Sequence, residues 1–255
     1  MTGAGDPSRG GAEPWYERAF RADYRLVYPH RDLASARTEA AFLVQRGVRG
    51  RVLDLGCGFG RHALALAELG CEVVGLDLSQ ELLLAARELP GYERSLRGRL
   101  VRGRAERAPF RSGAFDSVVV LFSSFGYLGP EGDRRAMAEI GRLTRPGGLA
   151  VLDLMNPGHV RSHLVPESER RGPGFELRES RALLEGGRRV VKEIELRLDG
   201  GAVRRWREDV RLYSLEEIAS LFRASGLSLE GADGAFDGRG LSADSPRILA
   251  RGRRA

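Results

Sequence analysis

The fold of this chain is decided by one stretch, Val52-Leu53-Asp54-Leu55-Gly56-Cys57-Gly58-Phe59-Gly60-Arg61-His62-Ala63-Leu64. The apolar run at its start predicts a buried strand, and the residues after its last glycine are typical of a helix. Its alternating glycines predict a tight loop, because glycine serves where the backbone must turn sharply or let a ligand come close. One acid, Asp54, precedes the loop, and another, Asp77, ends the next apolar run. The stretch therefore predicts a nucleotide-type crevice with two carboxylates.

The spacing of the glycines argues against a dinucleotide. Dinucleotide-binding loops place their third glycine three residues after the second and rest a pyrophosphate on a helix N-terminus. Gly56, Gly58 and Gly60 are evenly spaced instead, and Asp54 would repel a phosphate. S-adenosylmethionine has no phosphate but carries a sulfonium and an ammonium, so a nearby acid favours it. Asp77 can accept hydrogen bonds from ribose hydroxyls, as the acid about 20 residues further on does in dinucleotide sites.

Asp54, the glycine triplet and Asp77 together resemble the class I S-adenosylmethionine-dependent methyltransferases. The resemblance implies an enzyme with S-adenosylmethionine as its cofactor. It also implies a set of cofactor-binding residues: Asp54, Gly56, Cys57, Gly58, Gly60, Asp77, Leu78, Ala105, Glu106 and Phe122. The alternative is a strand-to-helix turn whose glycines serve only packing, with Asp77 capping the helix that begins after Ser79.

Length and composition favour one domain in the cytoplasm. The 255 residues are 42% hydrophobic and 30% charged, which is enough for one good core with a small subdomain. The net charge of +6 comes almost entirely from arginine, with Lys192 the only lysine, and this skew weakens any inference to a polyanionic partner. Cys57 and Cys71 are too few for a disulfide framework or a zinc site, so a reducing cytoplasm is expected.

Neither the start of the chain nor its apolar runs predict a membrane segment. Residues 1–14 are Gly-rich and polar, and we expect a disordered leader without a signal peptide before a methyltransferase domain at 15–255. The longest apolar run, 118–122, is far too short for a membrane span. Aromatic residues recur at helical spacing within 15–30, which predicts a helix that packs on the core or covers the cofactor.

The rest of the chain alternates strands and helices, as a parallel sheet with crossover helices requires. Asp32 and Ser79 are the expected N-caps of two of the helices. The expected fold class is α/β, a seven-stranded Rossmann-like methyltransferase sheet with helices on both faces. Its strands are predicted at 51–55, 72–77, 100–103, 116–122, 149–154, 228–236 and 246–251.

A change of pattern after the fifth strand predicts a small antiparallel insertion. Three alternating segments, 175–184, 188–198 and 202–213, are separated by Gly-Gly turns, which indicates a three-stranded meander on the sheet within 175–211. A capping box, Ser214 to Glu217, then predicts a helix that reaches Ser225.

Further segments extend the resemblance. Ala105-Glu106-Arg107-Ala108-Pro109-Phe110 resembles the adenine-side loop of the family, and Leu143-Thr144-Arg145-Pro146-Gly147-Gly148 its turn before strand five. Arg104 stands where such sequences often carry an aspartate for the adenine amino group. Glu106 or backbone atoms near Ala105 are expected to make that contact instead.

The loop after the fourth strand, Phe122-Ser123-Ser124-Phe125-Gly126-Tyr127, resembles that of deoxyamino-sugar N-methyltransferases, in which a histidine follows a similar Ser-Ser-x-Gly. Tyr127 stands at that place here. We expect it to be the catalytic residue that orients or deprotonates a nitrogen or oxygen of a small-molecule acceptor; the alternative is a tyrosine packed under the meander. Tyr28 and Asn156 are further candidates for substrate contact, although Asn156 before Pro157 also fits a local Asx turn.

No metal is expected, because methyl transfer does not need one and His30, His62, His159 and His163 show no ligand spacing. Two other functions stay open. An RNA methyltransferase is supported only by a basic stretch from Arg94 to Arg111, which lacks interleaved aromatics. A non-catalytic S-adenosylmethionine-binding module is the other, because a glycine loop indicates binding and not turnover. The oligomeric state is left open.

Overall fold

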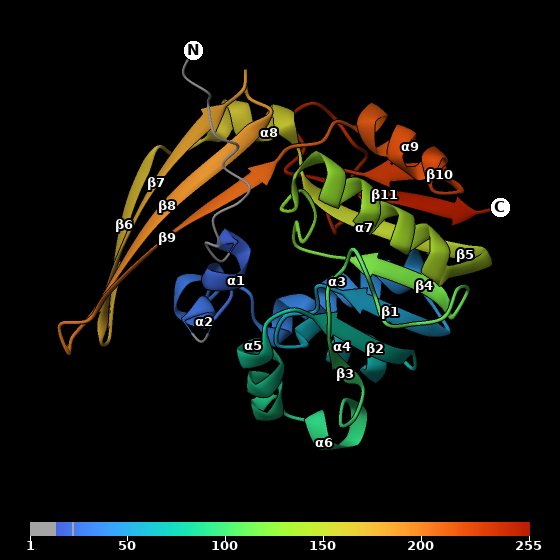
Figure 1. Ribbon diagram of the computed structural model, residues 1–255, viewed down its shortest axis with the longest axis horizontal. Helices are drawn as coiled ribbons and strands as arrows, with labels where there is room; N and C mark the ends of the chain where they lie inside the picture. The colour runs from blue at the N-terminus through green and yellow to red at the C-terminus, as the bar shows by residue number, and fades with distance from the viewer. Residues whose placement is uncertain (1–13, 22) are drawn as a thin grey trace, which may run out of the picture.

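A central sheet of seven strands is formed within residues 14–21 and 23–255, which the computed structural model describes (Figure 1). The strand order is β10-β11-β5-β4-β1-β2-β3. β1 to β5 pair in parallel, whereas β11 pairs antiparallel with both β5 and β10. The strands are β1 (Arg51–Leu55), β2 (Glu72–Asp77), β3 (Leu100–Arg102), β4 (Phe115–Val120), β5 (Thr144–Met155), β10 (Leu227–Asp233) and β11 (Arg247–Arg254). The predicted α/β fold is confirmed, and two predicted strands have the observed bounds.

Helices cover both faces of this sheet, because successive side chains of a buried strand point to opposite sides. In β1, Leu53 packs into a hydrophobic cluster with α7 and α9, and Val52 into a second cluster with α3 and α4. The larger helices are α3 (Leu33–Gln45), α4 (Arg61–Glu68), α5 (Gln80–Ala85), α7 (Gly129–Leu143), α8 (Pro157–His163) and α9 (Leu215–Ala224), with a short α6 (Tyr92–Ser95) and a 3₁₀ turn (Ala86–Glu88). No helix of the described residues is long and apolar enough to cross a membrane.

The predicted helix starts are confirmed in detail. The Asp32 carboxylate accepts from the Ser35 N–H at 2.8 Å, which caps α3. Ser79 Oγ accepts from the Leu82 N–H at 3.2 Å, which caps α5. The capping box of α9 is complete, with both reciprocal bonds between Ser214 and Glu217 present. Each cap satisfies an N–H that the helix itself leaves without a partner.

The N-terminal segment corrects one expectation. Instead of one helix over 15–30, it forms two short ones, α1 (Trp15–Ala19) and α2 (Tyr24–Val27). The break falls after Phe20, which leaves the helical conformation at φ −98° and ψ 67°. The leader expected at 1–14 lies, but for residue 14, outside the described residues.

Four further strands of the described chain form a separate antiparallel sheet in the order β6-β7-β8-β9, which we call the arm (residues 167–211). They are β6 (Glu167–Gly172), β7 (Phe175–Leu184), β8 (Arg189–Leu198) and β9 (Val203–Arg211). The predicted small β insertion is confirmed, but the arm is not laid on the central sheet and has a fourth strand. Because β6 is Glu-Ser-Glu-Arg-Arg-Gly, without one apolar side chain, it carries no strand signal in the sequence.

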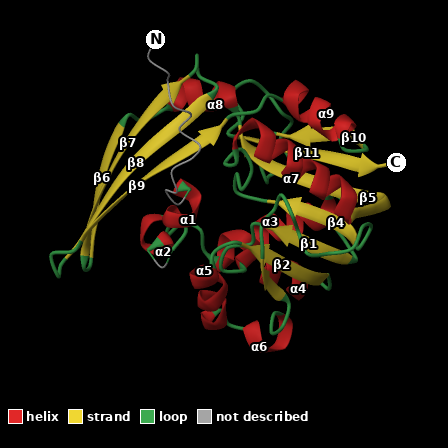
Figure 2. Ribbon diagram, viewed as in Figure 1, coloured by secondary structure: helices red, strands yellow, loops and turns green. Residues whose placement is uncertain are grey.

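The arm packs on the N-terminal segment. Val27 lies in a cluster with Leu177, Ile194 and Leu196 of the arm. The guanidinium of Arg170 donates to the carbonyls of Leu26 and Val27 at 2.6 and 2.9 Å. Figure 2 shows α1 and α2 between the arm and the central sheet. The segment is thus held between the two sheets, and this position brings it to the site described next.

Candidate active site

The glycine loop leads from β1 into α4 in left-handed backbone conformations. Gly56, Gly58 and Gly60 have φ values of 80°, 56° and 79°, which side chains rarely adopt. The N–H of Gly56 donates to the Leu76 carbonyl at 2.8 Å, which fixes the loop to β2. A Cβ on Gly56 would lie 2.8 Å from Cβ of Ser124, so this position also needs glycine for space. Gly60 serves differently, as the residue from which α4 begins.

Asp77 ends β2 opposite this loop. Its Oδ2 accepts from the Gly58 N–H at 2.7 Å and its Oδ1 from the Ser79 N–H at 2.8 Å. Burial raises the pKa of Asp77, while these backbone hydrogen bonds act in the opposite direction. The carboxylate thus stabilises the turn before α5, which is the structural role that the sequence analysis gave as the alternative. It also lines the cavity. Because each carboxylate oxygen has two lone pairs, it can still accept from a ligand.

A cavity of about 570 Å³ opens at the carboxyl ends of β1, β2, β3 and β4. Ligands of open α/β sheets bind at such an edge. Its walls come from the glycine loop, the loops after β2, β3 and β4, and the N-terminal segment. The structure brings together at this cavity eight of the predicted site residues, namely Gly56, Gly58, Asp77, Leu78, Ala105, Glu106, Phe122 and Tyr127.

The other predicted cofactor residues lie behind this wall. Among the described residues, the cavity lining includes neither Cys57 nor Gly60 nor Asp54. The sulfur of Cys57 faces β2, where a Cβ on Gly75 would lie 2.8 Å from it. Burial raises the pKa of this thiol well above its ordinary value, so Cys57 is a packing residue with an inert thiol.

Asp54 is buried at 1% exposure, and its Oδ2 has no hydrogen-bond partner among the described residues. Burial raises its pKa from 3.8 to about 7, against the opposite effects of Arg61 and of a hydrogen bond from the Ala63 N–H. Arg61 NH2 and Arg31 Nε are likewise buried without a partner in the part of the chain that the structure describes. A buried acceptor and two buried donors are thus left to be satisfied near the glycine loop, which fits a ligand with an ammonium and a carboxylate.

Arg31 and Arg61 were missed in the sequence. The only signal was that Arg61 directly follows the last glycine of the loop. Arg31 lines the cavity, and its guanidinium lies 5.1 Å from the centre of the Phe122 ring. The guanidinium of Arg61 lies 4.2 Å from the same ring and pairs with Glu39 at 3.0 Å. Two cations therefore meet at the aromatic ring that forms part of the cavity wall.

The loop after β4 is held in a rare backbone conformation. Phe122 and Ser123 have φ values of 53° and 58°, in the left-handed region that costs a side chain about 1–3 kcal/mol. Asp153 at the end of β5 compensates, because its Oδ2 accepts from the Phe122 N–H at 2.7 Å and its carbonyl from the Ser123 N–H at 2.9 Å. Arg247 of β11 pairs with the same carboxylate at 2.6 Å. These contacts hold Phe122 in the wall of the cavity.

Tyr127 lies in an aromatic wall built partly by the N-terminal segment. Its ring centroid lies 5.1 Å from that of Trp15 and 5.6 Å from that of Phe20. Phe20 in turn lies 5.8 Å from Tyr24. Burial raises the pKa of Tyr127 well above its ordinary value, so its hydroxyl stays protonated at neutral pH. It can donate or accept one hydrogen bond there, but a protonated phenol cannot act as a general base.

Tyr28 lies outside the lining of the cavity among the described residues, in a part-buried polar cluster with the arm. Its hydroxyl lies 2.6 Å from Glu208 Oε2 and accepts from Lys192 Nζ at 3.0 Å. Lys192 also pairs with Glu179. Burial lowers the pKa of Lys192, against the raising effects of Glu208 and Glu179. Because Tyr28 stacks near Tyr24 at 5.1 Å, the cluster reaches the cavity through that ring.

Asn156 takes the local role that the sequence left open. Its Oδ1 accepts from the Gly158 N–H at 3.1 Å, which makes an Asx turn at the start of α8. Its Nδ2 donates to the carbonyls of Ser242, Ala243 and Ser245 at 3.0, 3.3 and 2.8 Å. All its polar atoms are engaged, and in the described chain it is not part of the cavity lining. Substrate contact by Asn156 stays an untested prediction with no support from these contacts.

Arg104, which stands where similar sequences often carry an aspartate, lines the cavity. Its guanidinium pairs with Glu17 of α1 and lies 3.5 Å from Glu106. It thereby ties the N-terminal segment to the loop after β3. Two other arginines of the basic stretch pair with carboxylates of the protein itself, which leaves less charge for RNA; the pairs are Arg97–Glu93 and Arg99–Glu72.

Comparison with known proteins agrees with this geometry. Residues 52–148 match the family described as "Methyltransferase domain". The cypemycin N-terminal methyltransferase of a Streptomyces species is 31% identical over 80% of this chain and 83% of its own length. The dTDP-3-amino-3,4,6-trideoxy-alpha-D-glucopyranose N,N-dimethyltransferase of Streptomyces venezuelae is 30% identical over 91% of this chain and 99% of its own.

Among solved structures, the CcbJ methyltransferase from Streptomyces caelestis superposes with a TM-score of 0.73 at 23% identity, covering 86% of this chain and 95% of its own. This likeness shows the shared fold. The similarity to the Streptomyces venezuelae enzyme is not confined to the cofactor-binding half, because it extends over nearly all of both chains. The chain therefore belongs to the S-adenosylmethionine-dependent methyltransferases.

Proposed function

We propose that this methyltransferase transfers methyl groups to the amino nitrogen of a small-molecule acceptor. The observation that carries the proposal is the aromatic wall around Tyr127, which faces the cofactor loop across one cavity. Electron-rich rings attract an alkylammonium, the form in which a methylated amine leaves. The two relatives described above are, by their names, methyltransferases of an N-terminus and of an amino sugar.

The cofactor is held by the residues at the ends of β1 and β2. Gly56 and Gly58 let it approach the backbone, and Asp77 accepts from its ribose hydroxyls. Leu78, Ala105 and Glu106 lie on its adenine side. Arg31, which lines the cavity, faces its carboxylate, while Asp54 and Arg61 lie behind the cavity wall and act on the ammonium and the carboxylate through their charge. This assignment sets an opposite charge near each of the buried groups that the protein leaves with an unpartnered atom.

S-adenosylmethionine, when bound, supplies a methyl group on a sulfonium that is already a good leaving group. The protein has to orient the acceptor and exclude water, and orientation alone is worth roughly 7–11 kcal/mol. Because the Tyr127 hydroxyl stays protonated, it positions the nitrogen by a hydrogen bond and does not remove a proton from it. The amine must therefore reach the site uncharged, so that its lone pair is free to attack.

The arm holds the acceptor wall in place. Glu208 and Lys192 fix Tyr28, and Tyr28 packs against Tyr24 and under the guanidinium of Arg31, whose carbon lies 4.0 Å from the ring centroid. We also propose that residues 15–255 act as one methyltransferase domain with 175–211 as its insertion. A reducing cytoplasm is its proposed compartment, because Cys57 and Cys71 are both free thiols.

A screen of acceptors tests the function. The protein is incubated with labelled cofactor and a set of small amines, their hydroxyl analogues and RNA. We expect S-adenosylhomocysteine release and the mass gain of one methyl group with amines alone. Methylation of hydroxyl analogues in preference to amines, or of RNA, would overturn the proposal. Cofactor binding without turnover on any acceptor of the set would favour a binding module.

Replacing Gly58 by valine tests the cofactor loop. The side chain would enter the cavity and impose a positive φ on a β-branched residue, so S-adenosylhomocysteine binding should be lost in calorimetry. Gly70→Val is the matched control, because Gly70 also has a positive φ, 88°, with no atom within 4 Å of its Cβ position. We expect the control to lose stability and keep its affinity. Unchanged affinity in Gly58→Val would remove the basis for this loop's role.

Asp54 predicts a pH dependence with a definite sign. Because its pKa is raised from 3.8 to about 7, the folded protein binds a proton more tightly than the unfolded chain, and this stabilisation is lost as pH rises through that range. The unfolding free energy of the wild type, relative to Asp54→Asn, should fall from about pH 4 to about pH 7 and then level off. Cofactor affinity should do the reverse, weakening about tenfold per pH unit below 7 in the wild type alone. Parallel profiles in both proteins would contradict the assignment.

Tyr127→Phe removes one hydroxyl from the acceptor wall. Turnover should fall about 5- to 150-fold, the worth of one hydrogen bond of about 1–3 kcal/mol, while cofactor affinity stays unchanged. Tyr213→Phe is the control, since it loses a buried hydrogen bond to Asp133 of 2.7 Å outside the cavity. That variant should lose stability with little change in turnover. Wild-type turnover in Tyr127→Phe would show that this tyrosine only packs.

A further inference from the structure

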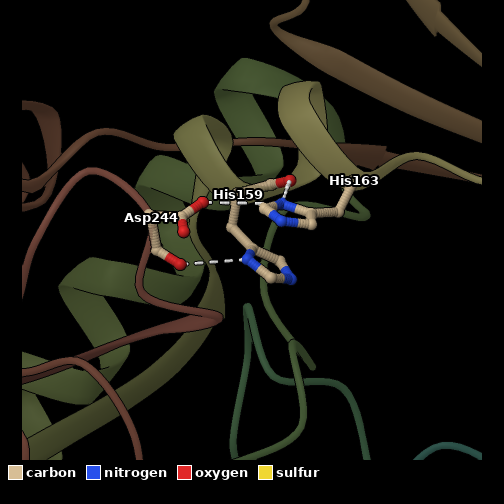
Figure 3. A group of neighbouring side chains, drawn as sticks. All are labelled: His159, His163 and Asp244. Atoms are coloured by element: carbon tan, nitrogen blue, oxygen red, sulfur yellow. Dashed lines mark hydrogen bonds and ion pairs between the residues drawn. The ribbon is translucent and has the colours of Figure 1, made fainter.

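Two histidines and an aspartate lie together away from the active site, where α8 meets the loop before β11 (Figure 3). His159 and His163 are one helical turn apart on α8 and therefore share a face of the helix. Their rings stack with centroids 4.2 Å apart. The ligand atoms of these two rings and of Asp244 all lie within 4.8 Å of one another. The sequence analysis found no ligand spacing among the histidines, and the position of Asp244 beside this pair is visible only in the fold.

The hydrogen bonds of both rings leave their other nitrogens free for a metal. Nδ1 of His159 lies 3.0 Å from the carbonyl of Asp244, and Nδ1 of His163 lies 3.2 Å from the carbonyl of His159 and 3.5 Å from Oδ1 of Asp244. Because a carbonyl only accepts, each Nδ1 carries the hydrogen. A neutral ring then presents the lone pair of Nε2. Ligating histidines commonly donate their second nitrogen to a carbonyl in this way.

The loop that carries Asp244 is positioned by the protein itself. Asn156 donates to the carbonyls on both sides of Asp244, those of Ala243 and Ser245. The loop also touches the first turn of α8, since a Cβ on Gly158 would lie 2.2 Å from the Ala243 carbonyl. Asp244 is thus placed opposite the two rings before any ligand binds, which lowers the ordering cost of binding.

We propose that His159, His163 and Asp244 bind a divalent transition metal, with zinc as the fitting probe. Imidazole and carboxylate are both zinc ligands, and three protein ligands leave a fourth position for water. Zinc bonds of about 2.0–2.2 Å require the ligand atoms to close up, by rotation of the exposed His163 and Asp244 side chains. Arg161 does not oppose the charge, because its guanidinium points to the Gly187 carbonyl at 3.4 Å.

The bound metal links α8, which leads into the arm, to the loop that enters β11. It thereby fixes the base of the arm to the central sheet. This role needs no part in methyl transfer, and the proposal does not rest on the acceptor assigned above.

Zinc titration of the untagged full-length protein tests the site. Calorimetry should show one equivalent of bound zinc, and the melting temperature should rise with zinc concentration. His163→Ala and Asp244→Asn, both at exposed positions, should each weaken binding more than about tenfold and abolish the rise. Both variants should bind S-adenosylhomocysteine with unchanged affinity, which would show that they are folded.

Two controls separate this site from adventitious binding. His30→Ala removes an exposed histidine elsewhere and should leave zinc affinity as it is. Cys71→Ser removes the more accessible thiol and should do the same. Wild-type zinc affinity in both site variants, loss of binding in either control, or no binding by the wild type would each overturn the proposal.

Discussion

The site depends most on the contacts that the Asp153 carboxylate makes with the Phe122 N–H and the Arg247 guanidinium. Phe122 and Ser123 adopt a backbone conformation that their side chains disfavour, and the hydrogen bonds that their N–H groups donate to Asp153 help to hold it. Arg247 neutralises the same carboxylate, which is fully buried. One acid thus joins β4, β5 and β11 at the edge where the cavity opens. The strain is stored where the cofactor loop, the arginines and the acceptor wall converge.

The cavity is a joint product of distant parts of the chain. The central sheet supplies the cofactor side, where the glycine loop and Asp77 are fixed by short-range hydrogen bonds. The proposed acceptor side comes largely from the N-terminal segment. Arg104 ties this segment to the loop after β3, and the arm contacts it through Arg170. The proposed cofactor loop and most of the proposed acceptor wall are therefore built from different parts of the chain, and Arg31 and Tyr127 lie in the one cavity between them.

Sequence patterns predicted the residues of the cofactor side better than those of the acceptor side, for physical reasons. The strand–loop–helix around Gly56 is formed by contiguous residues, so its glycines and acids can be recognised in the sequence without knowledge of distant partners. Arg31 left no such pattern and Arg61 only its place after Gly60, because arginine is so abundant here that a functional one resembles a solvated one. Glu208 and Asp244 meet their partners only through tertiary contacts. Asn156 was offered two roles, and the structure supports the Asx turn, since a polar residue at a strand end can serve the loop beside it.

The lone lysine has a practical consequence. Lys192 is the one side-chain amine of the chain, and it is held between the Tyr28 hydroxyl and two carboxylates. A reagent that acylates amines therefore finds a single side-chain amine, and 14% of that side chain is exposed. Its rate of labelling reports on the contact between the arm and the N-terminal segment, because Lys192 donates to Tyr28 there.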